Sequence, residues 1–196
     1  LNIAGATEGE KTAPVSQKDK SKGTRILYTA PQVWIAEDDA QRVNVGDKIT
    51  LLNWTNVIID KINKEGDHIT SIDSHIQDDN DYKKTLKFNW IHPTKNVKIQ
   101  MREWNHLLKV KQLGEDQDVL DCIFEIPYAD TLIYCDKSIE GAKKGSLYQL
   151  ERRCYIIVDE EAHDDKLPMT FLIPTGFQKK KLGLPTKITL ASDAAA

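Results

Sequence analysis

The sequence has few of the features that mark enzymes, membrane proteins or disulfide-bonded domains. Three of its 196 residues are cysteines, and its ten glycines form no cluster. An odd number of cysteines without a Cys-x-x-Cys spacing fits neither a disulfide framework nor a zinc site. Scattered glycines leave no loop to cradle a phosphate group. No apolar run approaches the roughly 18 residues that a membrane span requires, so we expect no membrane association.

The charges of the chain are nearly balanced. It carries 27 Lys and Arg residues against 30 Asp and Glu residues, which gives a formal net charge of −3 at pH 7. This balance excludes a polybasic arm that wraps nucleic acid without regard to sequence. The chain begins at Leu1 rather than at methionine, and it shows no basic or apolar region of a secretory signal. We therefore expect a globular, intracellular piece of a longer protein.

No motif of enzyme chemistry appears in the sequence. It has no nucleotide-binding glycine loop, no nucleophile elbow and no His-Glu-x-x-His pair. Residues 78–81 share only their acids with a calcium loop, because they lack its glycine and its closing glutamate. We expect this segment to be a solvated hairpin tip. The five histidines are scattered and none lies beside a cysteine, so we predict neither a catalytic residue nor a metal site.

Short runs of β-forming residues, separated by turns, fill the sequence from Arg25 onwards. The clearest run covers residues 84–90, in which apolar and polar side chains alternate as in a half-buried strand. Residues 115–123 have an acidic first turn and apolar residues at helical spacing, which predicts a short helix. Residues 5–24 are polar and are expected to form a loop or linker. The pattern predicts a mainly β fold of barrels or sandwiches with short helices.

The sequence also contains a candidate binding surface, in which basic clusters are interleaved with aromatic residues. Such surfaces suit single-stranded or loop RNA, because unpaired bases stack on aromatic rings and hydrogen-bond through their edges. In the alternative interpretation, the lysines only keep the protein soluble and the aromatic residues fill the core. The basic clusters are Lys83, Lys84 and Lys87, then Arg152 with Arg153, then residues 179–181, and the aromatic residues are Tyr82, Trp90, Tyr148 and Tyr155.

Five segments together carry a resemblance to a known family. Residues 46–56 are G-D-K-I-T-L-L-N-W-T-N, residues 81–90 are D-Y-K-K-T-L-K-F-N-W, and residues 104–108 are W-N-H-L-L. Residues 143–153 are K-K-G-S-L-Y-Q-L-E-R-R, and residues 173–176 are I-P-T-G. In this order, the segments resemble the C-terminal region of glutamyl-tRNA synthetases of the eukaryotic and archaeal type.

The resemblance implies a fold and a function. The C-terminal half of these enzymes consists of two β-barrels, related to barrels of ribosomal proteins, that read the tRNA anticodon. Carried over, the distal barrel covers residues 24–92 and the proximal barrel covers residues 93–196, with residues 1–13 as a candidate for completing it. The chain then is the anticodon-recognition region of a glutamate–tRNA ligase, without the catalytic domain. This segment needs no cofactor, whereas the full-length enzyme uses ATP with magnesium.

The same resemblance implies where the protein works and what it binds. The enzyme of this type is cytoplasmic, and it attaches glutamate to tRNA(Glu). The implied partners are the anticodon stem-loop of that tRNA and the enzyme's own catalytic domain. Multi-synthetase or scaffold proteins are a further candidate class of partner.

Five residues are candidate anticodon contacts, and the resemblance implies three of them, Gln149, Arg152 and Arg42. Gln149 offers an amide to the Watson–Crick edge of a base, and Arg152 offers a fork for a phosphate or for adjacent acceptors on a base. Arg42 matches a basic position near the third anticodon base. Thr50 and Trp54 share one face of a strand and are placed to meet a splayed base by stacking or apolar contact. A place in the core is equally open for Trp54.

Two departures from the family pattern concern glycine. Thr55 and Cys154 stand where the family has glycine, so we expect an unusual backbone conformation at one of these residues or both.

Three alternative functions stay open. They are the anticodon-binding region of a glutaminyl-tRNA synthetase, a stand-alone rRNA-binding barrel, and a barrel that binds proteins.

Overall fold

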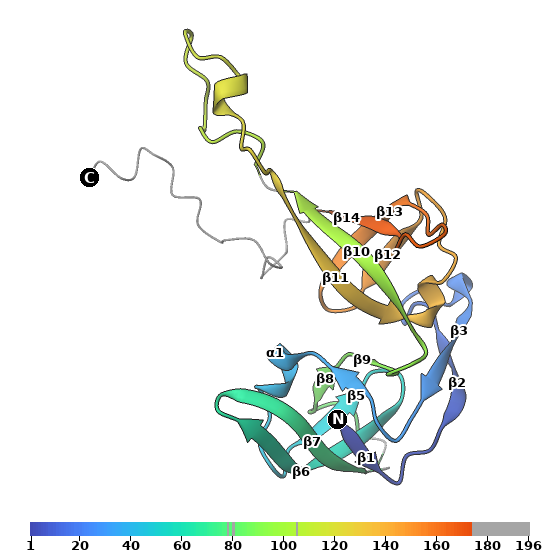
Figure 1. Ribbon diagram of the computed structural model, residues 1–196. Coiled ribbons are helices and arrows are strands. Elements are labelled where there is room, and N and C mark those ends of the chain that lie inside the picture. The colour runs from blue at the N-terminus through green and yellow to red at the C-terminus, as the bar shows by residue number, and fades with distance from the viewer. Residues whose placement is uncertain (78, 80, 105, 174–196) are drawn as a thin grey trace. The chain divides into compact units, whose positions relative to one another are not determined.

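The computed structural model describes residues 1–77, 79, 81–104 and 106–173, and the basic cluster at 179–181 lies outside them (Figure 1). The fold is mainly β, as the sequence predicted: two five-stranded sheets, two two-stranded sheets and short helices. Closure of the sheets into barrels stays a prediction. Contacts between residues divide the chain into two compact units. The first contains Leu1–Val97 with Tyr134–Glu140, and the second contains Lys98–Ile133 with the described residues from Gly141 onwards.

The first unit is built on a five-stranded sheet with the order β1-β7-β6-β5-β8. Its central strands pair in antiparallel fashion, whereas β1 and β8, at the two edges, pair in parallel with β7 and β5. The pairing of β1 places the start of the chain in this sheet, so these residues do not complete the second one. The strands are β1 (Asn2–Ala4), β5 (Lys48–Leu51), β6 (Thr55–Glu65), β7 (His68–Ile76) and β8 (Leu86–Phe88).

Alternating apolar residues of these strands form the core of the first unit. Ile49, Leu51, Val57 and Phe88 are all completely buried. β-Branched and aromatic side chains fit the pleated surface of a sheet, and each buried side chain of this size contributes about 1.5–3 kcal/mol to stability. The run 84–90, expected as one strand, is divided at Asn89. The division arises because β8 pairs with β5, whereas β9 (Trp90–Ile91) pairs with β4 (Trp34–Ile35).

Residues 5–24, expected as a loop or linker, contain a strand. β2 (Gly9–Pro14) pairs with β3 (Thr24–Thr29) along its whole length and forms a separate two-stranded ribbon. The loop of this ribbon contains the 3-10 helix η1 (Lys20–Lys22). The strand was not evident from the sequence because only Ala13 of β2 is buried, and Glu10, Lys11 and Thr12 are polar and exposed. A one-turn helix, α1 (Glu37–Ala40), follows β4.

The second sheet has the order β11-β10-β14-β13-β12. Its inner face buries Ile99, Met101, Ile156 and Val158, each no more than 1% exposed. β14 pairs in parallel with β10 and in antiparallel fashion with β13. The strands are β10 (Asn96–Trp104), β11 (Tyr128–Asp136), β12 (Leu147–Leu150), β13 (Cys154–Glu160) and β14 (Met169–Ile173).

The helix expected over residues 115–123 is only a 3-10 turn, η2 (Leu120–Cys122). Val119 and Leu120 are 46% and 76% exposed, so the apolar side chains at helical spacing do not share a buried face. Without such a face, tertiary packing does not stabilise a helix this short. A second 3-10 turn, η3 (Lys137–Ile139), follows β11 and is capped by Asp136, which accepts a hydrogen bond from the backbone N–H of Ser138.

A buried hydrogen-bond network centred on Asn56 connects the segments of the first unit. Asn56 lies on β6 and is 1% exposed. Its Oδ1 accepts a hydrogen bond from Thr50 Oγ1 at 2.7 Å. Its Nδ2 donates to Asp79 Oδ1 and to the carbonyl of Asp81, each at 3.0 Å. The backbone carbonyl of Asn56 also accepts from the N–H of Gln77 at 3.0 Å, so one side chain and its backbone hold β5, β6 and the segment after β7.

Asp79 has a structural role that corrects the expectation of a solvated hairpin tip. The segment is not the tip of a hairpin, because it connects β7 to β8 and these strands are not neighbours in the sheet. Lys48 Nζ donates to Asp79 Oδ2 at 2.7 Å, in addition to the bond from Asn56. These bonds stabilise the carboxylate, the one from Lys48 most, and lower the pKa of Asp79 from 3.8 to about 2.

Replacement of Asn56 tests the network. Asn56→Ala removes three side-chain hydrogen bonds and leaves buried partners without them, which we expect to lower the free energy of unfolding by about 3 kcal/mol. Asn63→Ala is the matched control, because Asn63 lies on the same strand and is only half-buried. We expect a loss of about 1 kcal/mol there. Urea denaturation measures both values, and equal losses for the two variants would contradict a special role of Asn56.

The lowered pKa of Asp79 predicts a pH dependence of stability. The folded state binds this proton less readily than the unfolded chain, so the stabilisation is complete above pH 3.8 and is lost as the pH falls towards about 2. The variant Asp79→Asn has no carboxylate at this position, so its stability has no contribution from Asp79 that could be lost at low pH. We therefore expect the difference in unfolding free energy between wild type and Asp79→Asn to shrink over this pH range. A difference that stays constant from pH 4 to pH 2 is the contrary result.

Candidate nucleic-acid interface

The turn that connects β5 to β6 carries one of the predicted contact residues, Trp54. The turn is closed by a hydrogen bond from the N–H of Trp54 to the carbonyl of Leu51 at 3.0 Å. The half-buried indole packs against the core cluster, and its ring centroid is 4.8 Å from that of Trp90. Trp90 Nε1 in turn donates to the carbonyl of Leu52 at 2.9 Å. Trp54 therefore contributes to the edge of the core, and part of its ring remains exposed.

Thr50 is nearly inaccessible. It is 5% exposed, and its hydroxyl donates to Asn56 and contacts the hydroxyl of Thr85. Ile49 and Leu51, on the opposite face of β5, are completely buried in the core. The structure thus gives Thr50 a hydrogen-bonding role inside the protein.

Arg42, by contrast, is accessible. Its side chain is 52% exposed and follows the short helix α1. Its Nη1 is 3.3 Å from Oδ1 of Asp39, a carboxylate that is itself buried. The guanidinium of Arg42 is thus exposed on the first unit while it is paired with Asp39.

Gln149 lies on the exposed face of the edge strand β12. Strand alternation directs Leu147 and Gln149 outwards and Tyr148 and Leu150 towards the sheet. The register places Gln149 directly opposite Tyr155 of β13, which is 44% exposed. Opposed side chains on one face of a sheet have their Cβ atoms about 5 Å apart. A base stacked on the ring of Tyr155 would therefore present its edge to the amide of Gln149.

Arg152 occupies the middle of the turn between β12 and β13. The N–H of Arg153 donates to the carbonyl of Leu150 at 2.9 Å and closes this turn. The backbone of Arg152 has φ of 63°, in the left-handed region that a side chain makes unfavourable by roughly 1 kcal/mol. The arginine that we single out for contact with RNA thus carries backbone strain, which residues at functional sites often do.

The two turns share one design. Asn53 has φ of 62° in the turn after β5, and Arg152 has φ of 63° in the turn after β12. Each is the middle residue of a three-residue connection closed by an i to i+3 hydrogen bond. We expected the unusual conformation at Thr55 and Cys154, and this expectation was wrong. In both hairpins the residue with positive φ lies two positions earlier, inside the turn. Thr55 and Cys154 themselves are the first residues of the strands β6 and β13.

The outer face of the second sheet contains charged and aromatic residues that the sequence motifs did not identify as candidate contacts. Arg102 forms a two-point ion pair with Asp130, with N–O distances of 2.7 and 2.8 Å, and its guanidinium lies 3.8 Å from the ring centroid of Tyr128. The bonds from Arg102 lower the pKa of Asp130. Trp104, 45% exposed, packs edge-on against Tyr128. Arg102 is thus held by two hydrogen bonds to Asp130, whereas Arg42 makes one longer contact, with Asp39. Only the pairing register and the alternation of strands identify this face.

The described residues include no group of three or more His, Cys, Asp and Glu residues arranged to hold a metal ion. Cys122, Cys135 and Cys154 are buried and form no disulfide, and burial raises the pKa of the Cys154 thiol. In the described part of the chain, no helix has the length and apolar character needed to cross a membrane.

Comparison with protein families gives a direct match. Two models, both described as "tRNA synthetases class I (E and Q), anti-codon binding domain", match residues 1–77 and 87–159 in that order. The chain belongs to this family of anticodon-binding domains. The turn at Asn53 lies in the first matched domain and the turn at Arg152 in the second, so each domain contributes one hairpin of the same design.

Individual relatives of this anticodon-binding chain agree with the match. The bifunctional glutamate/proline–tRNA ligase of Mus musculus is 31% identical over 165 residues, which are 82% of this chain and 11% of that protein. The cytoplasmic glutamate–tRNA ligase of Saccharomyces cerevisiae is 29% identical over 172 residues, 87% of this chain and 24% of that protein. The cytoplasmic enzyme of Arabidopsis thaliana is 28% identical over 167 residues, with shares of 83% and 23%. The chain spans at most about a quarter of the length of these relatives.

Two substitutions at Arg152 separate the effect of its backbone conformation on stability from the effect of its side chain. Arg152→Gly and Arg152→Ala remove the same guanidinium, but only glycine relieves the positive φ. We expect Arg152→Gly to be more stable than Arg152→Ala by about 1 kcal/mol in thermal or urea unfolding. The neighbouring pair Arg153→Gly and Arg153→Ala is the control, because Arg153 is not among the described residues with positive φ. There the order should reverse, and the same order at both positions would show that φ is not the cause.

Proposed function

We propose that this chain binds the anticodon loop of tRNA(Glu) and forms the recognition region of a glutamate–tRNA ligase. The observation that carries the proposal is the match of two consecutive anticodon-binding domains, together with relatives named as glutamate–tRNA ligases. The whole protein would then join glutamate to tRNA with ATP and magnesium through a catalytic domain outside this chain. Its place would be the cytoplasm, as the names of the yeast and plant relatives suggest.

The proposed contacts combine stacking with hydrogen bonding. In the second unit, Tyr155 offers a ring to a splayed base and Gln149 offers both a donor and an acceptor to its edge. Arg152 extends from the adjacent turn and offers its fork to a phosphate or to neighbouring acceptors on a base. In the first unit, Arg42 offers a charge, and the exposed part of Trp54 offers a stacking surface. The domain boundaries at residues 24–92 and 93–196 remain part of the proposal.

The glutaminyl enzyme is the alternative within the same family, since the family models cover glutamate and glutamine enzymes together. The relatives described above favour the glutamate branch by their names. The bifunctional relatives also join a glutamate and a proline ligase in one chain, which makes a larger synthetase assembly a candidate setting. A preference of the chain for the anticodon of tRNA(Gln) would instead assign it to the glutaminyl branch.

Anticodon substitution tests this function. We expect the 196-residue chain to bind the anticodon stem-loop of tRNA(Glu) more tightly than a copy with one anticodon base replaced. The loss should be about 1–3 kcal/mol per base, measured by fluorescence anisotropy at a fixed salt concentration. Gln149→Ala and Arg152→Ala should reduce this preference, because they remove groups that read base edges.

Two control variants keep this test specific. Gln100→Ala removes a glutamine amide whose Nε2 is bound to Asp130 at 2.9 Å, and Arg153→Ala removes an exposed arginine in the same turn as Arg152. We expect both controls to keep the preference for the cognate anticodon. Equal affinity of the wild-type chain for the two stem-loops would contradict anticodon recognition. A preference that survives in Gln149→Ala and Arg152→Ala would contradict the assignment of these residues.

A further inference from the structure

We propose that two basic segments of the first unit bind the phosphate backbone of the RNA whose anticodon the chain reads. They are the loop 15–23 between β2 and β3 and the turn 82–85 before β8. The inference rests on the proposed function, because it takes the RNA partner from there. It adds a sequence-independent contact, separate from base recognition, on two segments that project from the sheet.

The loop 15–23 presents three lysines on a rigid support. Lys18, Lys20 and Lys22 are all exposed, and Lys20 and Lys22 belong to the 3-10 helix η1. Asp19, the one acid in this loop, accepts hydrogen bonds from the N–H and the hydroxyl of Ser21 at 3.0 and 2.6 Å. The loop therefore has an excess of positive charge, and its single carboxylate is occupied in shaping the backbone.

The ribbon that carries this loop is fixed beside the turn at Asn53. Lys11 Nζ on β2 donates to the carbonyl of Trp54 at 2.9 Å, and Gln17 Nε2 donates to Asn53 Oδ1. At the other end of the ribbon, Glu8 Oε2 is 3.1 Å from Nε2 of the buried His92. These contacts place the basic loop next to the turn that carries Trp54, so RNA that stacks on Trp54 passes close to the lysines.

The turn 82–85 presents a second pair of lysines. Lys83 and Lys84 are exposed, whereas Lys87 closes the turn from inside by donating to the carbonyl of Thr85 at 2.8 Å and to that of Tyr82. Thr85 also contacts the hydroxyl of Thr50, which connects the turn to the network of Asn56. The two ammonium groups therefore extend from a fixed backbone.

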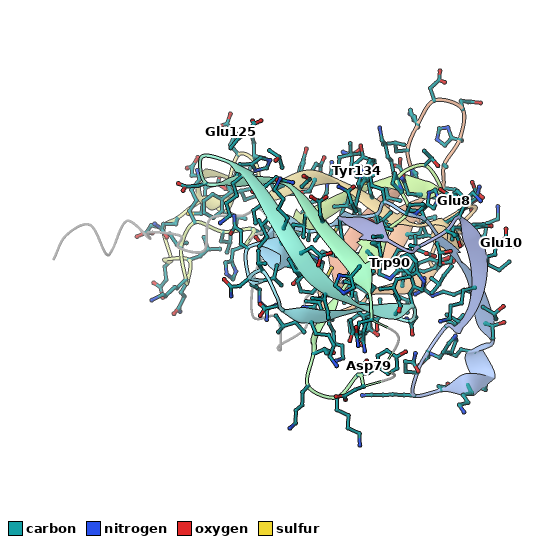
Figure 2. The ribbon with its side chains drawn as sticks, turned by 90° about the horizontal axis from the view of Figure 1, so that it is seen from below. Glu8, Glu10, Asp79, Trp90, Glu125 and Tyr134 are labelled. Carbon is teal, nitrogen blue, oxygen red and sulfur yellow. The ribbon has the colours of Figure 1, made fainter. Side chains whose placement is uncertain are left out.

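The acids beside this turn are partly offset by a lysine of the sheet. Lys48 Nζ is 2.7 Å from Asp79 and 3.8 Å from Asp81, so one of their two negative charges is balanced there. Among the described residues, no carboxylate forms an ion pair with Lys18, Lys20, Lys83 or Lys84. Figure 2 shows the pale blue hairpin and the pale green segment next to Asp79 projecting at the same lower edge of the view.

The chemistry of these segments fits RNA phosphates better than a protein surface. Lysine acts as a compact, mobile point charge on phosphate, and each phosphate that it neutralises releases counterions. Protein interfaces are depleted in lysine and need a buried apolar centre, which these exposed polar segments do not provide. The two segments thus supply affinity, while the residues of the interface supply the choice of sequence.

Salt dependence of binding tests this division. The whole 196-residue chain is titrated with the tRNA(Glu) anticodon stem-loop and with its anticodon-substituted copy over a range of salt concentrations. We expect Lys18→Ala with Lys20→Ala, and separately Lys83→Ala with Lys84→Ala, to weaken binding to both RNAs by the same factor. Each double variant should reduce the slope of log affinity against log salt by about 1.5, since each phosphate contact contributes roughly 0.7–0.9.

Lys61→Ala with Lys64→Ala is the matched control. These exposed lysines lie near the far end of β6, and Lys64 is about 30 Å along the strand from the turn at Trp54. The control should leave the slope unchanged, and Lys83→Arg with Lys84→Arg should retain it because the charges remain. If both pairs of alanine substitutions show the salt slope of the wild-type chain and the wild-type chain still prefers the cognate anticodon, this inference is overturned and the proposed function stands. Loss of slope without any anticodon preference in wild type would overturn the proposed function and leave this inference standing.

Discussion

The hydrogen bonds of Asn56 are the constraint on which the first unit depends. A fully buried amide must satisfy its donors and its acceptor inside the protein, and Asn56 does so with Thr50, Asp79 and the carbonyl of Asp81. Asn56 and Thr50 lie in the segment 46–56 and Asp81 begins the segment 81–90, whereas Asp79 lies between the two. One network therefore connects two of the segments that resemble the synthetases. That network fixes the turn 82–85 relative to β5, and β5 leads directly into the turn that carries Trp54.

The two anticodon-binding domains use the same local device at different places. Each connects two neighbouring antiparallel strands by a three-residue turn whose middle residue has a positive φ, Asn53 in one domain and Arg152 in the other. Asparagine tolerates this conformation better than most residues, whereas arginine does so at a cost in stability. The turn of Arg152 connects the strands that carry Gln149 and Tyr155, which lie directly opposite each other.

Much of the fold, and the family, could be predicted from the sequence, whereas the contact residues stay a prediction. Alternating apolar residues gave the mainly β fold, and ordered motifs indicated the family. Alternation could not show that Thr50 is buried, because whether a strand is covered on both faces depends on segments distant in sequence. It also did not reveal β2, in which only Ala13 is buried, and it suggested a helix at 115–123 where Val119 and Leu120 are exposed. Tyr155 emerges as a partner of Gln149 only from the pairing register of β12 and β13.

The central claim is that RNA meets the chain at these two turns and at the basic segments beside one of them. Hydrogen–deuterium exchange of the whole chain, with and without the tRNA(Glu) anticodon stem-loop, tests it most directly. The account predicts slower exchange at residues 149–155, at residues 52–54 and in the turn 82–85, with little change at the β6–β7 turn. The substituted stem-loop should retain protection at 82–85 and lose it at 149–155. Protection confined to the β6–β7 turn, or identical for both RNAs at 149–155, would contradict it.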